Sequence, residues 1–275
     1  NLKRGDDDFA GAVVGIGALG VVTRLTLDVQ PSYQVQQQIF EGLEWETLFA
    51  EFDRVTSAAE SVSLFTDYSD AVGQLWLKTR VDPEQPKALL TEFLGAPAAT
   101  KQLHPVPTIS PDNCTDQLGV PGSWADRLPH FRMDAVPASG DEIQSEHMVA
   151  RDQAIDALRA VLAHAPEIRP HLWTSEIRTV KADDLWLSSA YGTDTVCIHF
   201  SFRNRPEQVD RLVQLVEEVL APFSPRPHWG KLFFASAGDL RPRYARMADF
   251  HALARKLDPR GKFRSAFLNR HVFGV

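Results

Sequence analysis

Between Thr195 and Arg203 the sequence alternates strictly between apolar and polar side chains. Successive side chains of a β-strand point to opposite faces, so this pattern predicts a strand with one wholly apolar face. That face carries Val196, Ile198, Phe200 and Phe202, and we expect it to pack against helices. The opposite face carries Thr195, Cys197, His199, Ser201 and Arg203. These polar residues must either meet water or line a site.

Two further segments, Trp173–Val180 and Glu142–Val149, also read as strands with one polar face. The polar residues on these faces are Thr174, Glu176 and Arg178 in the first strand, and Glu142, Gln144 and Glu146 in the second. Antiparallel sheets often face water on one side, so a solvated surface explains the pattern equally well. In the other interpretation the faces meet in one pocket. Its carboxylate, amide, cationic and hydroxyl groups would suit a ligand with several hydroxyls.

The other segments mix helices and strands without a strict βαβ repeat, which predicts an α+β fold. We expect a large, mostly antiparallel sheet flanked by helices on one side. Helices are predicted at Trp45–Ala58, Lys87–Phe93, Arg151–His164, Pro206–Leu220 and Tyr244–Leu257. Further strands are predicted within Ala12–Val29, at Gln74–Val81 and at Lys231–Ala235. The loop from Ala96 to Ser139 contains Trp124, Leu128, Phe131 and Met133, which favour packing over a disordered linker.

Composition excludes several classes of protein. The net charge of −7, from 29 basic and 36 acidic residues, argues against binding to nucleic acid. Neither CxxC nor HExxH occurs, so we expect no metal site, and Cys114 and Cys197 are expected to be free thiols. No apolar run approaches the ~20 residues of a membrane helix. These features predict a cytoplasmic protein, and the start at Asn1 within a charged loop suggests that an upstream piece is missing.

The segment Gly15-Ile-Gly17-Ala-Leu-Gly20 matches the GxGxxG pattern of dinucleotide-binding proteins. That mechanism requires a helix after the glycines, whose N-terminus receives the pyrophosphate. Here a β-branched run, beginning with Val21 and Val22, follows instead and favours a strand. The better interpretation is a strand, a tight glycine turn and a second strand. The turn is either purely structural or leaves bare backbone that a flat ligand could approach.

A second local feature is His228-Trp-Gly-Lys231, where a lysine opens the apolar segment Leu232-Phe-Phe234. The lysine could simply extend its charged end to water from the end of a strand. Alternatively, a desolvated lysine beside an arginine could assist deprotonation of an alcohol.

Several segments together closely resemble the alditol and xylitol oxidases, a group within the vanillyl-alcohol-oxidase type of flavoprotein that also includes sugar-1,4-lactone oxidases. They are Gly17–Pro31, Ser175–Val180, Asp183–Ser188, Ile198–Phe202, Arg226–Phe233 and Asp258–Gly274. The resemblance spans nearly the whole chain, and HWGK together with DPRGKF is its most specific part. It implies FAD-dependent oxidation of the terminal hydroxyl of a polyol such as xylitol or sorbitol. Hydride would pass to the flavin and then to O₂, giving an aldose and hydrogen peroxide.

The resemblance also implies roles for individual residues. Glu176 would hold substrate hydroxyls, while Arg178 and Lys231 would polarise the reacting hydroxyl and help to deprotonate it. Gln144, His199 and Ser201 would complete the substrate-binding wall, with Ser201 standing where relatives commonly have threonine. The flavin would lie beside Gly17, Gly20, Val21, Val22 and His228.

The resemblance further implies a division of the chain into two parts. Residues 1–33 would be the end of an FAD-binding domain and 34–275 a substrate-binding domain, with about 240–275 packing back toward the FAD domain. Relatives attach FAD through an N-terminal histidine region without a counterpart here, so we expect this chain alone to bind FAD poorly and to be inactive. Two alternatives stay open: a sugar-1,4-lactone oxidase, and a non-catalytic module that binds a polyol or a protein.

Overall fold

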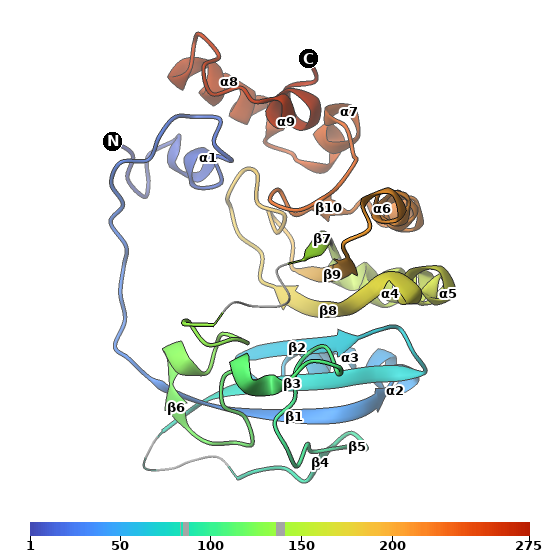
Figure 1. Ribbon diagram of the computed structural model, residues 1–275. Helices are drawn as coiled ribbons and strands as arrows, with labels where there is room; N and C mark the ends of the chain where they lie inside the picture. Colours follow the sequence, from blue (N-terminus) through green and yellow to red (C-terminus); the bar gives the residue numbers. More distant parts are fainter. Residues whose placement is uncertain (83, 85–87, 136–140) are drawn as a thin grey trace.

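The computed structural model describes residues 1–82, 84, 88–135 and 141–275. Its centre is an eight-stranded sheet with the order β10-β7-β9-β8-β2-β3-β1-β6, and all neighbouring pairs are antiparallel (Figure 1). The strands are β1 (Gln34–Glu44), β2 (Ser61–Thr66), β3 (Ala71–Val81), β6 (Gly122–Ser123), β7 (Glu142–Ala150), β8 (Leu172–Val180), β9 (Thr195–Arg203) and β10 (Arg226–Pro227). The predicted α+β fold with a large antiparallel sheet is confirmed.

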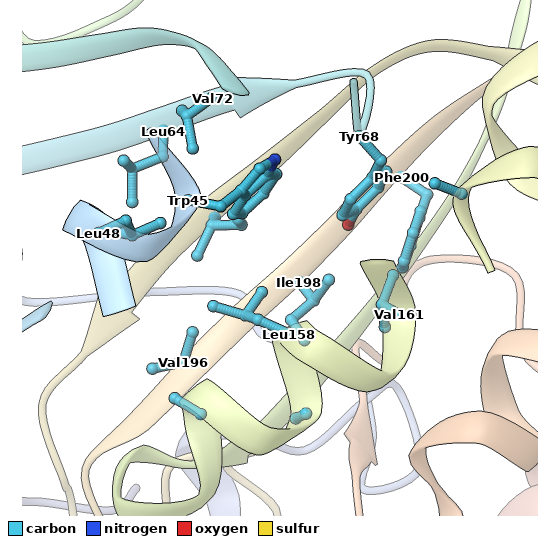
Figure 2. Close-up of a cluster of buried hydrophobic side chains, with 14 of the residues drawn as sticks. Trp45, Leu48, Leu64, Tyr68, Val72, Leu158, Val161, Val196, Ile198 and Phe200 are labelled. Carbon is cyan, nitrogen blue, oxygen red and sulfur yellow. The ribbon is translucent and has the colours of Figure 1, made fainter. Parts of the chain in front are cut away.

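One face of the sheet is covered by helices that follow or join the strands. They are α2 (Trp45–Ala50), α3 (Phe52–Thr56), α4 (Ala154–Ala163), α5 (Ala165–Ile168) and α6 (Pro206–Leu220). The apolar face of β9 is fully buried in this layer, as predicted. Figure 2 shows the centre of the core, where Leu158 and Val161 of α4 meet Val196 and Ile198 of β9. The predicted helix at Pro206–Leu220 has the predicted bounds, while the one at Trp45–Ala58 is broken at Glu51.

The opposite face of the sheet is covered by the long loop after β5 (Ala96–Pro97). Buried glutamine side chains fasten this loop: Gln74 donates to the His104 carbonyl at 2.9 Å, and Gln37 donates to the Asp116 carbonyl at 3.2 Å. The loop therefore packs against the sheet, as predicted. Each glutamine amide hydrogen-bonds a buried loop carbonyl that would otherwise lack a partner. Two of the residues expected to anchor it are exposed, however: Trp124 stacks on Tyr33 at the surface, and Met133 is 85% exposed.

Residues 20–33 are not strand, contrary to the prediction for Ala12–Val29. Within the described residues no strand pairs with this segment, and Val21, Val22 and Val29 are 76%, 71% and 93% exposed. Alternation alone does not make a strand, because the ladder requires a neighbouring strand. As expected, no helix follows Gly20; the helix of this region is α1 (Phe9–Val13), which precedes the glycines.

Two short predicted elements are also wrong. In the described part of Lys87–Phe93, β4 (Glu92–Phe93) forms a hairpin with β5 instead of a helix, with Gly95 at φ +84° in the turn. Lys231–Ala235 is not a strand: the Leu232 amide donates to the Gln144 carbonyl of β7, but the amides of Phe234 and Ala235 donate to the side chain of Glu217 on α6. At this edge of the sheet, β10 is the strand that pairs with β7.

The C-terminal residues form a second hydrophobic cluster. It joins α7 (Ala237–Leu240), α8 (Met247–Leu257), α9 (Ala266–Leu268) and the π-helix Asn269–Phe273 to the N-terminal segment around α1. The helix predicted at Tyr244–Leu257 thus begins at Met247. Lys256 of α8 also contacts Asp8 at 2.5 Å, and both ends of the chain lie on the same side of the molecule (Figure 1). No described helix is long and apolar enough to span a lipid bilayer.

Helix α6 offers a test of the packing. We expect Leu220→Ala, at a fully buried position, to lower the free energy of unfolding by about 2–5 kcal/mol, because it removes buried methyl groups and leaves a cavity. Gln214→Ala on the exposed face of the same helix is the control and should change it by less than ~0.5 kcal/mol. Urea-induced unfolding measures both values. Equal effects would contradict the assigned helix face.

Candidate functional site

The strand registers bring the predicted polar faces together on the loop-covered side of the sheet. His199 in β9 lies between Glu146 of β7 and Glu176 of β8, directly opposite both. One pair further along, Ser201 lies between Gln144 and Thr174. Neighbouring cross-strand positions are about 5 Å apart, so these side chains form one continuous polar surface.

This surface forms one wall of a cavity of about 220 Å³. The cavity contains all six residues predicted to bind substrate, namely Gln144, Glu176, Arg178, His199, Ser201 and Lys231. It is completed by Glu142 and Thr174 of the sheet, and by Phe65, His104, Pro105, Val106, His130 and Phe131, mostly from the covering loop. The polar faces are therefore not a solvated surface, since His199 and Ser201 are buried.

Glu146 links the two cations of the site. Its Oε1 accepts from Arg178 Nη2 at 2.9 Å, and its Oε2 accepts from Lys231 Nζ at 2.5 Å. The Glu146 side chain is 3% exposed. Burial opposes its ionisation, but the charges of Lys231 and Arg178 outweigh burial and hold the pKa of Glu146 below its usual range. Sequence reasoning placed Glu146 on a polar strand face without assigning it to the site; the lysine that pairs with it lies 85 residues away.

Glu176, on the other side of His199 from Glu146, is also held in its ionised form. His130 Nε2 lies 3.1 Å from Glu176 Oε1, and Arg178 Nε lies 3.6 Å from Glu176 Oε2. Burial raises the pKa of Glu176, but the His130 hydrogen bond and the Arg178 charge outweigh it and lower the pKa to about 2. A carboxylate only accepts hydrogen bonds, so Glu176 is suited to receive hydroxyl protons. His130 was not predicted, because it stands in the loop, where no periodicity marks it.

His199 is buried with neither ring nitrogen hydrogen-bonded within the part of the chain that the structure describes. Burial, assisted by the Lys231 charge, lowers its pKa to about 4, so the ring is neutral near pH 7. A neutral imidazole carries one donor and one acceptor, and leaving both unused inside a protein is costly. A ligand in the cavity would satisfy them.

Hydroxyl and amide groups surround Glu142 at the far end of the wall. Ser201 Oγ donates to Glu142 Oε2 at 2.8 Å, and Gln144 Nε2 donates to Glu142 Oε1. Taken together, the cavity offers acceptors, donors and two cations within one small volume. Such a set can bind a chain of hydroxyl groups and stabilise negative charge that develops on one of them.

The predicted cofactor residues lie apart from this cavity. Of the described residues, none from 1–33 lines it. Gly17 and Gly20 have φ of +78° and +132°, and a side chain at Gly17 would meet no atom within 4 Å, so the backbone there is bare and open. His228 lies closer to the site, since its amide donates to the Glu146 carbonyl at 2.9 Å and its carbonyl accepts from the Lys231 amide at 3.1 Å.

Acid stability tests the environment of Glu176. Its pKa is lowered on folding from 4.5 to about 2, so its ionisation stabilises the fold fully above pH 4.5 and progressively less as the pH falls toward 2. We expect Glu176→Gln to remove this part of the pH dependence, on the order of 3 kcal/mol, measured by urea unfolding across that window. Glu218→Gln, exposed on α6, is the control. A wild-type slope retained in Glu176→Gln would show that the carboxylate is not held ionised.

Comparisons with known proteins support the resemblance. Residues 142–271 match the family model described as D-arabinono-1,4-lactone oxidase. Alditol oxidase from Streptomyces sp. is 49% identical over 97% of this chain, which covers 63% of that protein. L-gulono-1,4-lactone dehydrogenase from Mycobacterium tuberculosis is 24% identical over 98% of the chain and 64% of its own length. L-gulonolactone oxidase from Scyliorhinus torazame is 30% identical over 44% of the chain and 28% of its own length.

The chain thus spans slightly less than two thirds of the length of the relatives that it matches throughout. The resemblance predicted from the sequence is confirmed as a similarity: nearly the whole chain matches an alditol oxidase, and residues 142–271 match a sugar-lactone oxidase family model.

Proposed function

We propose that the intact protein oxidises the terminal hydroxyl of polyols such as xylitol and sorbitol, with O₂ as acceptor, to give an aldose and hydrogen peroxide. The observation that carries this proposal is the cavity of about 220 Å³, whose lining includes buried polar groups without a hydrogen-bond partner among the described residues. Both nitrogens of His199 and Nε of Arg178 are buried without a hydrogen bond among the described residues. The 49% identity to an alditol oxidase supports the choice of polyols.

The wall of the cavity matches the chemistry of a polyol. Each hydroxyl of such a molecule is both a donor and an acceptor, and the polar wall alternates between the two kinds of group. Glu176 and Glu142 accept, Gln144 and the neutral His199 can do either, and Arg178 donates. Phe65, Val106 and Phe131 add apolar surface to the lining, and the small volume restricts the length of chain that fits.

Arg178 and Lys231 are placed to act on the reacting hydroxyl. Both line the cavity, and Glu146 holds their charged ends close to one another. A hydroxyl oxygen that lies between them would face two cations, so the negative charge that develops as its proton leaves would be stabilised. Because the groups are already fixed by Glu146, little reorganisation is needed during the reaction.

We propose FAD as the cofactor. When bound, it would supply the oxidant, accepting hydride from the alcohol carbon and passing the electrons to O₂. Gly17, Gly20, Val21 and Val22 would border it, because their bare or exposed surfaces could be covered by a flat ring system. His228, whose backbone hydrogen-bonds to that of Glu146 and Lys231, would lie near the flavin.

The proposed division of the chain follows from the same reasoning. Residues 1–33 would belong to the FAD-binding part and 34–275 to the substrate-binding part. The contacts of α8, α9 and the π-helix with the segment around α1 support the proposal that about 240–275 packs toward the FAD-binding part.

Substitution of the two cations tests the proposed chemistry. We expect Lys231→Met or Arg178→Ala in the intact protein to slow flavin reduction by xylitol by ~10²–10⁴-fold, because each removes a positioned charge from the reacting hydroxyl. Stopped-flow absorbance measures the rate. Lys181→Met, an exposed lysine just after β8, is the matched control and should keep the wild-type rate. A wild-type rate of flavin reduction in Lys231→Met or Arg178→Ala would contradict the proposed roles of these two residues.

Lactone oxidation is the second candidate, because residues 142–271 match a lactone oxidase family model. A peroxide assay on polyols and on sugar-1,4-lactones separates the two. We expect kcat/KM to be at least ~10-fold higher for polyols, since C1 of a lactone is a ring carbonyl and not the hydroxyl that Arg178 and Lys231 would contact. Preference for lactones would overturn the polyol proposal, and no peroxide from either would favour a non-catalytic binding module.

A further inference from the structure

A lysine lies buried in the middle of the sheet, behind the candidate site. Lys78 of β3 is 1% exposed, and its side chain points to the loop-covered face. Its Nζ donates to the Leu128 carbonyl at 2.5 Å and lies 3.1 Å from His130 Nδ1. Nothing in the proposed reaction uses this residue. A buried lysine costs free energy, so its presence calls for a specific partner.

The partner of Lys78 connects it to the cavity. The other ring nitrogen of His130, Nε2, lies 3.1 Å from Glu176 Oε1. The three side chains therefore form a line, from a buried ammonium through an imidazole to the carboxylate that faces the cavity. His130 is itself a lining residue, so it reaches the site while Lys78 stays behind it.

Aromatic rings keep His130 in this orientation. Phe65 and Trp76 each stand edge-on to the imidazole, with centroids 5.2 Å and 5.3 Å away and interplanar angles of 77° and 83°. Ser63 Oγ, at 3.5 Å from Nε2, is the other polar neighbour. The ring is thus held with one edge toward Lys78 and the other toward Glu176.

The chemistry of the two ends fixes where the imidazole proton lies. An ammonium group only donates hydrogen bonds, so Nδ1 of His130 must accept from Lys78. A neutral imidazole then carries its single proton on Nε2, where it can be donated to Glu176. Glu176, receiving this bond, keeps Oε2 for Arg178 and for a ligand.

The charges around Lys78 agree with this arrangement. Burial lowers the pKa of Lys78 to about 7, opposed by the charge of Glu176 and, more weakly, by Cys114 of the loop. Burial also lowers the pKa of His130, with the charges of Lys78 and Arg178 acting in the same direction, so the ring is neutral near pH 7. Below that pH the ammonium form of Lys78 holds the tautomer of His130.

We propose that Lys78 and His130 are positioning residues of the candidate site: Lys78 fixes the Nε2–H tautomer of His130, which orients Glu176 as an acceptor for substrate hydroxyls. This inference rests on the proposed polyol oxidation for its effect on substrate. The tautomer itself does not depend on that function.

The tautomer can be observed directly by ¹⁵N NMR of the histidine rings in the intact protein, below pH 7. His130→Gln identifies the His130 signals by their loss. We expect a neutral ring protonated at Nε2 in the wild type and in Glu176→Gln, where Lys78 alone fixes the proton. In the double variant Lys78→Met/Glu176→Gln neither end fixes it, so both tautomers should be populated; methionine keeps the apolar stem but cannot donate. Lys181→Met should leave the His130 signals unchanged. A wild-type proton on Nδ1, or an Nε2–H tautomer kept unchanged in the double variant, would overturn the proposal.

A second pair of variants tests the effect on substrate and remains usable if Lys78→Met does not fold. His130→Leu removes both hydrogen bonds, whereas His130→Gln retains a donor and an acceptor. We expect the apparent Kd for xylitol, measured from flavin reduction, to rise ~10–100-fold in His130→Leu. The limiting reduction rate should fall by less than ~3-fold, because hydroxyls remote from the reaction are bound equally before and during it.

We expect His130→Gln to recover most of the lost affinity. A limiting rate that falls as far as the affinity, or no recovery by glutamine, would contradict a positioning role. If xylitol fails to reduce the flavin of the wild type, the proposed function is wrong, and the NMR result alone then decides the proposal on Lys78 and His130.

Discussion

The organisation of this molecule depends on β9 being buried on both faces. Its apolar residues meet the helical layer, while His199 and Ser201 on the other side line a cavity that the loop between β5 and β7 also lines. A polar strand face under a covering segment must find partners, because buried polar groups without hydrogen bonds are costly. The strands on either side supply some of them, and His199, whose ring nitrogens remain unpaired among the described residues, faces a cavity. The apolar face of β9 thus belongs to the hydrophobic core, and its polar face belongs to the candidate site.

Ion pairs stabilise the charged side chains in and around that cavity. A continuous series of neighbouring side chains alternates between positive and negative charge. Its members are Lys78, Glu176, Arg178, Glu146 and Lys231, with His130 between the first two. Removing any one partner would leave its neighbours as uncompensated buried charges, which is more costly than the pair itself is stabilising. The arrangement is therefore expected to hold the acceptor Glu176 and the two cations at fixed places. Such preorganisation is what binding and polarising a hydroxyl require.

Elements with a strong internal period were predicted well, and those that depend on distant partners were not. Pro206–Leu220 and Thr195–Arg203 have their predicted bounds, because amphipathic periodicity reports which face is buried. The alternating segment after Gly20 is not a strand, since no described strand pairs with it. In Lys231–Ala235 the amides of Phe234 and Ala235 bond to the Glu217 carboxylate and not to a strand. Similarly, Gln144, Glu176, Arg178, His199 and Ser201 were found by parity, whereas His130 in an irregular loop was not.

The sequence by itself determined which side chains share a face, because that follows from the two-residue period of a strand and needs no knowledge of neighbours. It also carries the similarity to the alditol oxidases, which the comparison with a Streptomyces alditol oxidase supports. Only the tertiary structure decided which faces meet. The antiparallel register sets Glu146 and Glu176 on either side of His199, and the loop brings His130 between Lys78 and Glu176. The physical reason is that hydrogen bonds and ion pairs act over a few ångströms, while the residues they join are tens of positions apart in the chain.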